Sequence, residues 1–361
     1  MKELYAARIA RVLENLQAQG LEQMIVSDPT TIFYLTGVRI QPGERMLALL
    51  LRADGAHRFF VNALFGRPEA GLPLEILHDG EDAPARLLPF VEKEKPLGID
   101  KDWPARFLIR LMELHAAPEY RNASDACDDA RAVKDAAEQE AMRASSKVND
   151  DCMAEFEALI RPGITEKEMA DAIRGIYAAH GCSDVSFAPI CGFGPHAADP
   201  HHDNDDTPLT AGQCVLIDVG GVYHDYCSDM TRTFFTAEPT EEERRVYELV
   251  RQAQAAAEAL VKPGVRLCDI DAAARDVITA GGYGPYFYHR LGHFIGLQDH
   301  EAGDVSAVNE NVVIPGMCFS IEPGIYLPGK FGVRIEDLVL VTEEGCEVLN
   351  RYPHELRVHA L

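Results

Sequence analysis

The sequence predicts a smaller N-terminal α/β domain over residues 1–127 and a larger α+β domain over residues 128–361. Two observations support this fold class. Short apolar runs alternate with a helical pattern in the first third of the chain, whereas short β-type segments and long helices fill the rest. At 361 residues, the chain is long enough for two domains or one large one, and either can bury a full core.

The N-terminal part opens with an amphipathic helix, because apolar residues recur at helical spacing from Leu4 to Leu16 and Gly20 then stops the pattern. Three strands and a second helix should follow it, at 24–26, 46–51, 59–61 and 106–114. The polar stretch from Arg121 to Asp129 holds no large apolar residue, so it is predicted to be a linker.

The C-terminal part begins with a long helix over 134–159, which Pro162 and Gly163 end. Thr165 and Glu168 have the spacing of a capping box before a helix over 169–179. Short strands predominate from Ser186 onward, and helices are expected around 241–260 and 268–280. A helix-flanked antiparallel sheet is the natural interpretation.

Composition narrows the choice of partners and compartment. The formal charge of -24 argues against nucleic acid and anionic membranes as partners. The nine cysteines form no CxxC pair and are odd in number, which suits reduced thiols in a cytoplasm. Neither a signal peptide nor a membrane span is expected.

Two predicted hairpins carry acidic residues inside apolar strands. Asp218 follows Val-Leu-Ile directly, and a hairpin with a turn near 222–225 can bring it together with Asp229 across the sheet. The simpler interpretation is that these aspartates are turn residues, but a carboxylate buried after three apolar residues is costly without a partner. Glu322 and Glu336 occupy a similar downstream hairpin, where alternation places Arg334 on the same face as Glu336.

Between the hairpins lies a glycine-punctuated apolar segment with three histidines, His289, His293 and His300. A lone histidine is more often structural than a ligand, but three in such a segment favour a site. His201 lies on a predicted loop, Pro200–Asp206, for which a polar surface loop is the simpler interpretation and a third, weak ion site an alternative.

One imidazole and four carboxylates suit two hard or borderline divalent cations. Two such cations neutralise four carboxylates and would activate a water molecule for hydrolysis. The predicted ligands are Asp218, Asp229, His293, Glu322 and Glu336.

The chain resembles a known family in several strings, namely IDVG…SDMTRTF, GHFIGL…HE, SIEPGIY and GVRIED. These are similar to the metal-dependent proline peptidases, the Xaa-Pro dipeptidases (prolidases) and Xaa-Pro aminopeptidases. Their pita-bread fold is shared with methionine aminopeptidase and creatinase. Residues 20–26 and 32–37 also resemble the N-terminal domain of that family, so the resemblance spans almost the whole chain.

The resemblance implies a role for each site residue. Asp229 and Glu336 would bridge two ions, and Asp218, His293 and Glu322 would bind one each. His201 and His300 would contact the scissile carbonyl or the proline, Glu322 would transfer the proton, and His289 would support them. Arg334 would orient Glu336. Manganese is the expected metal, with cobalt, zinc and iron as alternatives, and a homodimer is expected.

The substrate is expected to be a short proline-containing peptide with a free N-terminus. Prolidases commonly have an arginine shortly after the His-Glu pair, where this chain has Asp304, whose charge would repel the carboxylate of a dipeptide. Arg290 or Arg334 would be a substitute. Phe294, at a position where relatives often have glycine, is expected to pack against the sheet or to narrow the pocket.

Three other functions fit the sequence less well than a metal-dependent proline peptidase. A creatinase-like amidinohydrolase works without metals, and methionine aminopeptidase usually lacks such an N-terminal domain. A non-catalytic binding protein on a peptidase scaffold usually loses ligands or catalytic histidines, all of which are present here.

Overall fold

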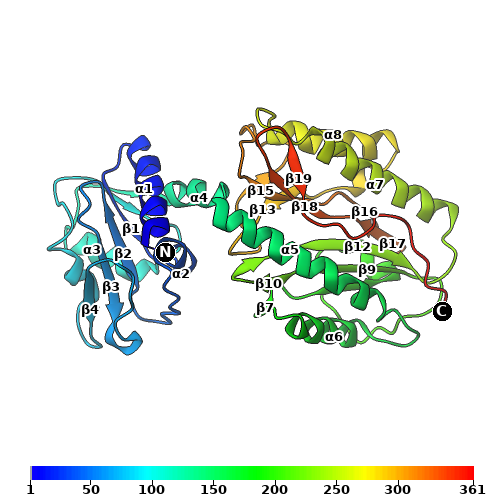
Figure 1. Ribbon diagram of the computed structural model, residues 1–361, viewed down its shortest axis with the longest axis horizontal. Coiled ribbons are helices and arrows are strands. Elements are labelled where there is room, and N and C mark those ends of the chain that lie inside the picture. The colour runs from blue at the N-terminus through cyan, green and yellow to red at the C-terminus, as the bar shows by residue number, and fades with distance from the viewer. Residues whose placement is uncertain (1) are drawn as a thin grey trace. The chain divides into compact units, whose positions relative to one another are not determined.

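The computed structural model describes residues 2–361 and divides into one compact unit ending at Arg131 and a second, Ala132–Leu361 (Figure 1). The assignment of residues 1–127 and 128–361 as separate domains stays a prediction. None of the described helices combines the length and apolar character needed to cross a membrane.

The N-terminal unit is built on a six-stranded mixed sheet in the order β4-β3-β2-β1-β5-β6. Strand β1 pairs antiparallel with β2 and parallel with β5, and its residues are all buried. The predicted helices and strands of this unit are confirmed to within two residues. Its elements are α1 (Lys2–Ala18), β1 (Gln23–Val26), α2 (Pro29–Thr36), β2 (Ala48–Arg52), β3 (Arg58–Asn62), β4 (Leu74–Leu77), β5 (Leu97–Ile99), α3 (Ala105–Glu113), β6 (Tyr120–Asn122) and α4 (Ser124–Ala132).

The linker predicted from Arg121 to Asp129 is wrong, because this stretch forms the end of β6 and most of α4. The side chain of Asn122 accepts a hydrogen bond from the main-chain N–H of Ser124 at 3.1 Å, at the start of α4. Ala126 and Ala130 are buried. Small side chains allow a polar-looking helix to pack closely, and hydrophobicity alone does not reveal this.

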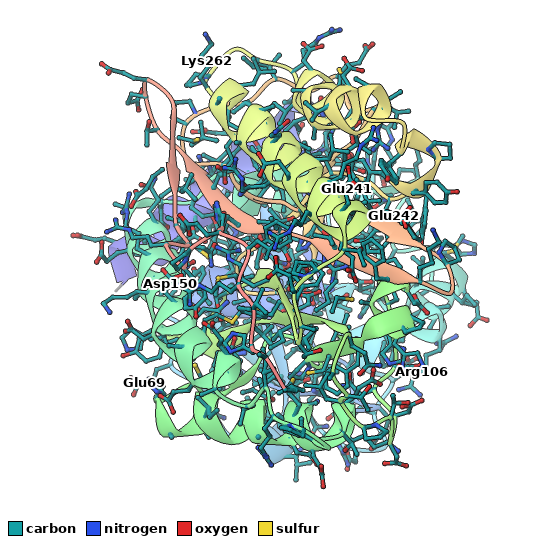
Figure 2. All side chains as sticks on the ribbon, turned by 90° about the vertical axis from the view of Figure 1, so that its right-hand side faces the viewer. Glu69, Arg106, Asp150, Glu241, Glu242 and Lys262 are labelled. Carbon is teal, nitrogen blue, oxygen red and sulfur yellow. The ribbon has the colours of Figure 1, made fainter. Side chains whose placement is uncertain are left out.

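The second unit contains two pairs of helices that cover strands, as Figure 1 shows. All four predicted helices of this unit and the capping box of Thr165 and Glu168 are confirmed. The helices are α5 (Ala136–Glu157), α6 (Glu166–Ala179), α7 (Glu241–Leu260) and α8 (Leu267–Ala280). The side chains of Glu241 and Glu242, in the first turn of α7, are exposed (Figure 2). Their negative charges stabilise the helix by interacting with the positive end of its dipole.

The strands of the second unit form antiparallel pairs. Two of the sheets have the orders β12-β9-β8 and β14-β13-β15-β18-β19. The strands are β7 (Asp184–Val185), β8 (Ile190–Phe193), β9 (Cys214–Val219), β10 (Gly221–Tyr223), β11 (Tyr226–Cys227), β12 (Met230–Phe235), β13 (Gly292–Phe294), β14 (Glu301–Val305), β15 (Cys318–Ile321), β16 (Gly324–Leu327), β17 (Phe331–Arg334), β18 (Asp337–Val341) and β19 (Cys346–Val348).

Strand β9 is buried on both faces, and its alternation decides where Asp218 points. Val215 and Ile217 belong to the apolar cluster that contains Phe156 of α5. Leu216 belongs to the other cluster, with Val246 of α7. Because side chains alternate along a strand, Asp218 shares the face of Leu216.

Candidate metal centre and active site

The predicted site residues lie around one cavity of about 640 Å3 in the second unit. Every one of them lines it: Asp218, Asp229, His293, Glu322, Glu336, His201, His289, His300 and Arg334. The sequence therefore predicted which residues come together, whereas their chemical roles remain predictions.

Both predicted hairpins are interrupted, and the breaks hold their acidic residues except Asp218, which lies inside β9 and pairs with Thr231. In the first, β9 pairs with β12 and β10 with β11, and Asp229 lies in the break between β11 and β12. His224 and Asp225 make the tight turn at its tip, with φ angles of 50° and 69°. In the second, β15 pairs with β18 and β16 with β17, and the breaks hold Glu322 and Glu336. Each break releases a carboxylate from the ladder and lets it turn toward the cavity.

His293 is fixed by its neighbours on β13 and β15. Its main-chain N–H donates to the hydroxyl of Ser320 at 3.0 Å, and that hydroxyl donates to Glu322 at 3.2 Å. Gly292 lies so close to Ser320 that a Cβ there would overlap the main-chain oxygen of Ser320. This close approach aligns the imidazole with the two glutamates.

The ligand atoms form three overlapping groups, in each of which they lie within 4.8 Å of one another. Asp229, His293 and Glu336 each belong to two groups. Overlap of this kind is what a centre with two adjacent cations requires. The groups are Asp218, Asp229 and Glu336; His293, Glu322 and Glu336; and Asp229, His293 and Asp299.

Burial shifts the pKa values of this cluster strongly. Burial, and then the charge of Glu336, raises the pKa of Asp229 well above its usual value, while burial raises that of Glu322 to about 8. Burial and the nearby His300 lower the pKa of His293 to about 3. Burial and mutual repulsion disfavour the ionised form of these carboxyls. A metal ion bound among them would supply the positive charge that offsets both effects.

Arg334 takes part in a buried hydrogen-bond network that connects Asp218 with Glu336. Its guanidinium donates to Asp218, to the hydroxyl of Tyr326 at 2.9 Å and to that of Thr231 at 3.0 Å. Thr231 donates in turn to Glu336 at 2.7 Å. Arg334 thus holds Asp218 and is linked to Glu336 through Thr231, and the expectation that it orients Glu336 stays a prediction.

His289 extends this network rather than facing the carboxylates. Its Nδ1 is 2.6 Å from the main-chain oxygen of Arg290, so Nδ1 donates and Nε2 accepts from the hydroxyl of Tyr326 at 2.9 Å. Burial, and then the charge of Arg334, lowers the pKa of His289 to about 4. His289 is thus a neutral support for Tyr326.

The other two histidines lie at the open side of the cavity. His201 is exposed on its loop, and the side chain of His300 is 57% exposed. The ring of His300 lies 3.9 Å from that of His293, measured between centroids. Both histidines are accessible to a ligand in the cavity.

Asp304 does not line the cavity, so it is not placed to repel a substrate there. Its carboxylate accepts hydrogen bonds from Ser306 at 2.8 Å and Asn309 at 3.3 Å. A bulge between His293 and Phe294 shifts the register of β13 and β14. The ring of Phe294 is buried against Phe319, as predicted for a packing role.

The sequence interpretation missed Asp299, Tyr326 and Glu166. Asp299 is a further acidic residue between the predicted site residues His293 and His300, and Tyr326 ends the SIEPGIY string; both were available signals.

Glu166 is fully buried, and its carboxylate organises the loop that carries His201. It accepts from His196 at 2.9 Å and from His202 at 2.6 Å, as well as from the main-chain N–H groups of Phe193 at 3.0 Å and Asp205 at 3.1 Å. These four donors satisfy the carboxylate without a cation. This favours a structural role for Glu166, in which it holds the loop in place, over the third ion site that was an alternative for this loop. No local pattern identifies Glu166, because its partners lie 27 to 39 residues away.

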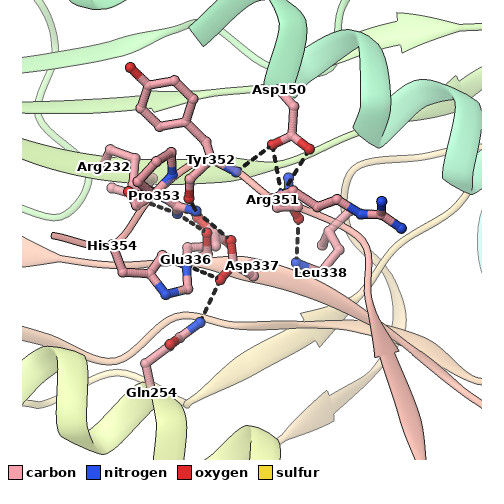
Figure 3. Close-up of polar contacts among 12 residues, drawn as sticks. Asp150, Arg232, Gln254, Glu336, Asp337, Leu338, Arg351, Tyr352, Pro353 and His354 are labelled. Carbon is pink, nitrogen blue, oxygen red and sulfur yellow. Dashed lines mark hydrogen bonds and ion pairs between the residues drawn. The ribbon is translucent and has the colours of Figure 1, made fainter. Parts of the chain in front are cut away.

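A second buried arginine, Arg232, contacts the strand end that carries Glu336 (Figure 3). Arg232 donates to the main-chain oxygen of Glu336 and to the carboxylate of Asp337, both at 2.7 Å. The other oxygen of Asp337 accepts from Gln254 of α7 at 2.6 Å and lies 2.6 Å from Nε2 of His354. The strand end that carries Glu336 is therefore tied to α7 and to the C-terminal segment.

Comparisons with known proteins agree with this geometry. Residues 140–343 match the model of metallopeptidase family M24, and residues 8–133 match the creatinase/prolidase N-terminal domain. An uncharacterized peptidase of Staphylococcus haemolyticus is 35% identical over 357 residues, which cover 96% of this chain and 99% of that protein.

Two solved structures are similar over nearly their full length. The dipeptidase PepE from Mycobacterium ulcerans has a TM-score of 0.94 at 36% identity, covering 100% of this chain and 99% of that one. The recombinant prolidase from Thermococcus sibiricus has a TM-score of 0.92 at 32% identity, covering 98% and 99%. The chain therefore belongs to metallopeptidase family M24 and is a peptidase with the pita-bread fold.

Proposed function

We propose that the protein is a peptidase with two divalent metal ions that hydrolyses the Xaa-Pro bond next to a free N-terminus. The observation that carries this proposal is the set of overlapping ligand groups, in which Asp229 and Glu336 are shared. The similarity to a dipeptidase and a prolidase supports the choice of substrate class.

The residues present fit two cations. Asp218 and Asp229 each have a buried Oδ1 atom without a hydrogen-bond partner among the described residues. An unpartnered buried carboxylate oxygen is costly, and coordination removes that cost. A donor set of oxygens with one imidazole suits manganese, and cobalt, zinc and iron fit the same donors.

Each surrounding residue then has a proposed task. The ions, when bound, polarise the scissile carbonyl and acidify water. Glu322 accepts a proton and passes it to the prolyl nitrogen as the bond breaks. His201 and His300, which are accessible from the cavity, donate hydrogen bonds to the carbonyl oxygen or contact the proline. Arg334 aligns Asp218 by donating a hydrogen bond to its carboxylate.

Dipeptides are the substrates that the cavity suits best. Asp304 is engaged outside the cavity, so its charge does not oppose a terminal carboxylate there. Arg334 is committed to Asp218, Tyr326 and Thr231, whereas Arg290 lines the cavity and is partly exposed. Arg290 is therefore the cationic group proposed to bind the carboxylate of a dipeptide.

A comparison of an Xaa-Pro dipeptide with an Xaa-Pro-Yaa tripeptide, each with and without manganese, tests the proposal. We expect metal-dependent cleavage of the dipeptide, and cleavage of only the tripeptide would make the protein an aminopeptidase. His293→Ala and Glu336→Ala should abolish both metal loading and turnover. Full activity in either variant, or absence of metal from protein purified without chelator together with no cleavage of any Xaa-Pro peptide, would refute the proposed centre.

The assembly and compartment are further proposals. A cytoplasmic homodimer without nucleic-acid or membrane partners is proposed from the family resemblance, the net charge of -24 and an odd number of cysteines, nine, that form no CxxC pair. Sedimentation of the purified protein as a monomer of 39.8 kDa would refute the dimer.

A further inference from the structure

Asp299 is an additional carboxylate at the edge of the proposed metal centre. It lines the cavity, and its side chain is 20% exposed. One of its oxygens belongs to a ligand group with Asp229 and His293, whose atoms lie within 4.8 Å of one another. Its position therefore places it at the end of the centre that contains His293.

Asp299 is only partly hydrogen-bonded, and its carboxyl lies beside that of Asp229. Its Oδ1 is buried without a partner among the described residues, and Oδ2 lies 3.5 Å from Nε2 of His300, beyond a good hydrogen bond. Oδ1 of the neighbouring Asp229 is likewise buried and unpartnered. Glu166, with four donors, shows how this fold satisfies a structural carboxylate. Two adjacent unpartnered carboxylate oxygens indicate a shared cationic ligand.

The charge of the centre points the same way. The four predicted carboxylate ligands and the buried Arg334 together carry a net charge of -3, because Arg334 pairs with Asp218. Ionised Asp299 brings the charge to -4, which two divalent cations neutralise. The charge of Asp299 thus makes up for the one negative charge that Arg334 neutralises at Asp218.

We propose that Asp299 is a sixth protein ligand, bound to the same ion as His293. This proposal rests on the proposed function, since it assumes cations at the centre. The ion held by His293 would gain a further hard oxygen donor, which suits manganese better than zinc because manganese accepts more oxygen ligands.

Metal titration of the metal-free protein by calorimetry, with metal analysis after dialysis, tests the assignment without using activity. Asp299→Asn should weaken binding of one ion at least tenfold and leave the other within threefold of wild type. Asp203→Asn is the matched control, because Asp203 lines the same cavity but belongs to no ligand group. It removes the same charge and should change neither affinity by more than threefold.

Equal affinities in Asp299→Asn and wild type would overturn the assignment, as would equal weakening in both variants, which would reflect charge alone. Unchanged metal affinities with a selective rise in KM for Lys-Pro over Leu-Pro would also overturn it, and would make Asp299 a contact for a cationic substrate. If wild type itself binds no metal, the proposed function fails first. Thermal melting of Asp299→Asn verifies that it folds.

Discussion

Replacing Asp337 by asparagine should destabilise the second unit and loosen the metal centre together. Asp337 is fully buried and accepts from Arg232 at 2.7 Å and Gln254 at 2.6 Å. Asparagine has nearly the same shape, but it removes the charge and presents an amide where an acceptor is needed. Arg232, 1% exposed, would then keep a positive charge without the buried carboxylate of Asp337.

The magnitude follows from these contacts. Hydrogen bonds to charged groups contribute about 1.5–3 kcal/mol each, and breaking a buried ion pair costs about 3–5 kcal/mol. Because asparagine retains one acceptor, we expect a loss near the lower end, about 3 kcal/mol. For a unit of this size, about 2–4 °C per kcal/mol converts that loss to a fall in Tm of roughly 6–12 °C.

Calorimetric melting in the presence of chelator measures this loss without a contribution from bound metal. The matched control is Asp151→Asn, whose carboxylate is 50% exposed and pairs with the exposed Lys147 at 2.5 Å, so its effect should stay below about 0.5 kcal/mol. Arg232 also binds the main-chain oxygen of Glu336, so Asp337→Asn should weaken metal binding as well. A Tm within 2 °C of wild type would refute the reasoning about this network.

Three further predictions concern pH, the His201 loop and the metal. Burial lowers the pKa of His289 from 6.5 to about 4, so its neutral form stabilises the fold fully above pH 6.5. This contribution is lost as the pH falls toward 4. The variant His289→Asn should therefore have a flatter Tm profile between these pH values. Glu166→Gln should lower kcat/KM and the Tm, because His196 and His202 lose a charged acceptor, whereas the exposed control Asp206→Asn should retain both. Removing metal with chelator should lower the Tm by the equivalent of about 2.7 kcal/mol for each ion that had been present at 100 times its Kd, and manganese should restore it. An unchanged pH profile, an active Glu166→Gln or a Tm insensitive to chelator would each contradict the corresponding argument.

The sequence predicted the parts of this site that depend on local pattern. Asp218 and Glu336 were found because a carboxylate inside an apolar strand needs a cation or a hydrogen-bonded partner. The breaks in the two hairpins were not foreseen, because they depend on pairing between strands. For the same reason, the hydrogen bond of Arg334 to Asp218 was not foreseen: strand alternation predicted the face of Arg334, whereas Asp218 lies 116 residues away in the chain.

Errors elsewhere have the same origin. Helix α4 was predicted to be a linker because small buried residues such as Ala126 and Ala130 leave no apolar pattern, although they pack well. Asp304 was expected near the substrate because it follows the His300-Glu301 pair closely, whereas Ser306 and Asn309 donate hydrogen bonds to its carboxylate. Position along the chain does not reveal such local contacts.

The contact at Gly292 limits how this gene can vary. Any other residue would introduce a Cβ into the main-chain oxygen of Ser320 and separate the two strands that hold His293 and Glu322. A substitution one position away from an imidazole would therefore be as damaging as loss of the imidazole, although glycine has no chemistry of its own. Random mutagenesis scored by peptidase activity should leave Gly292 as invariant as His293, while Gly345, with open space around it, should accept many residues.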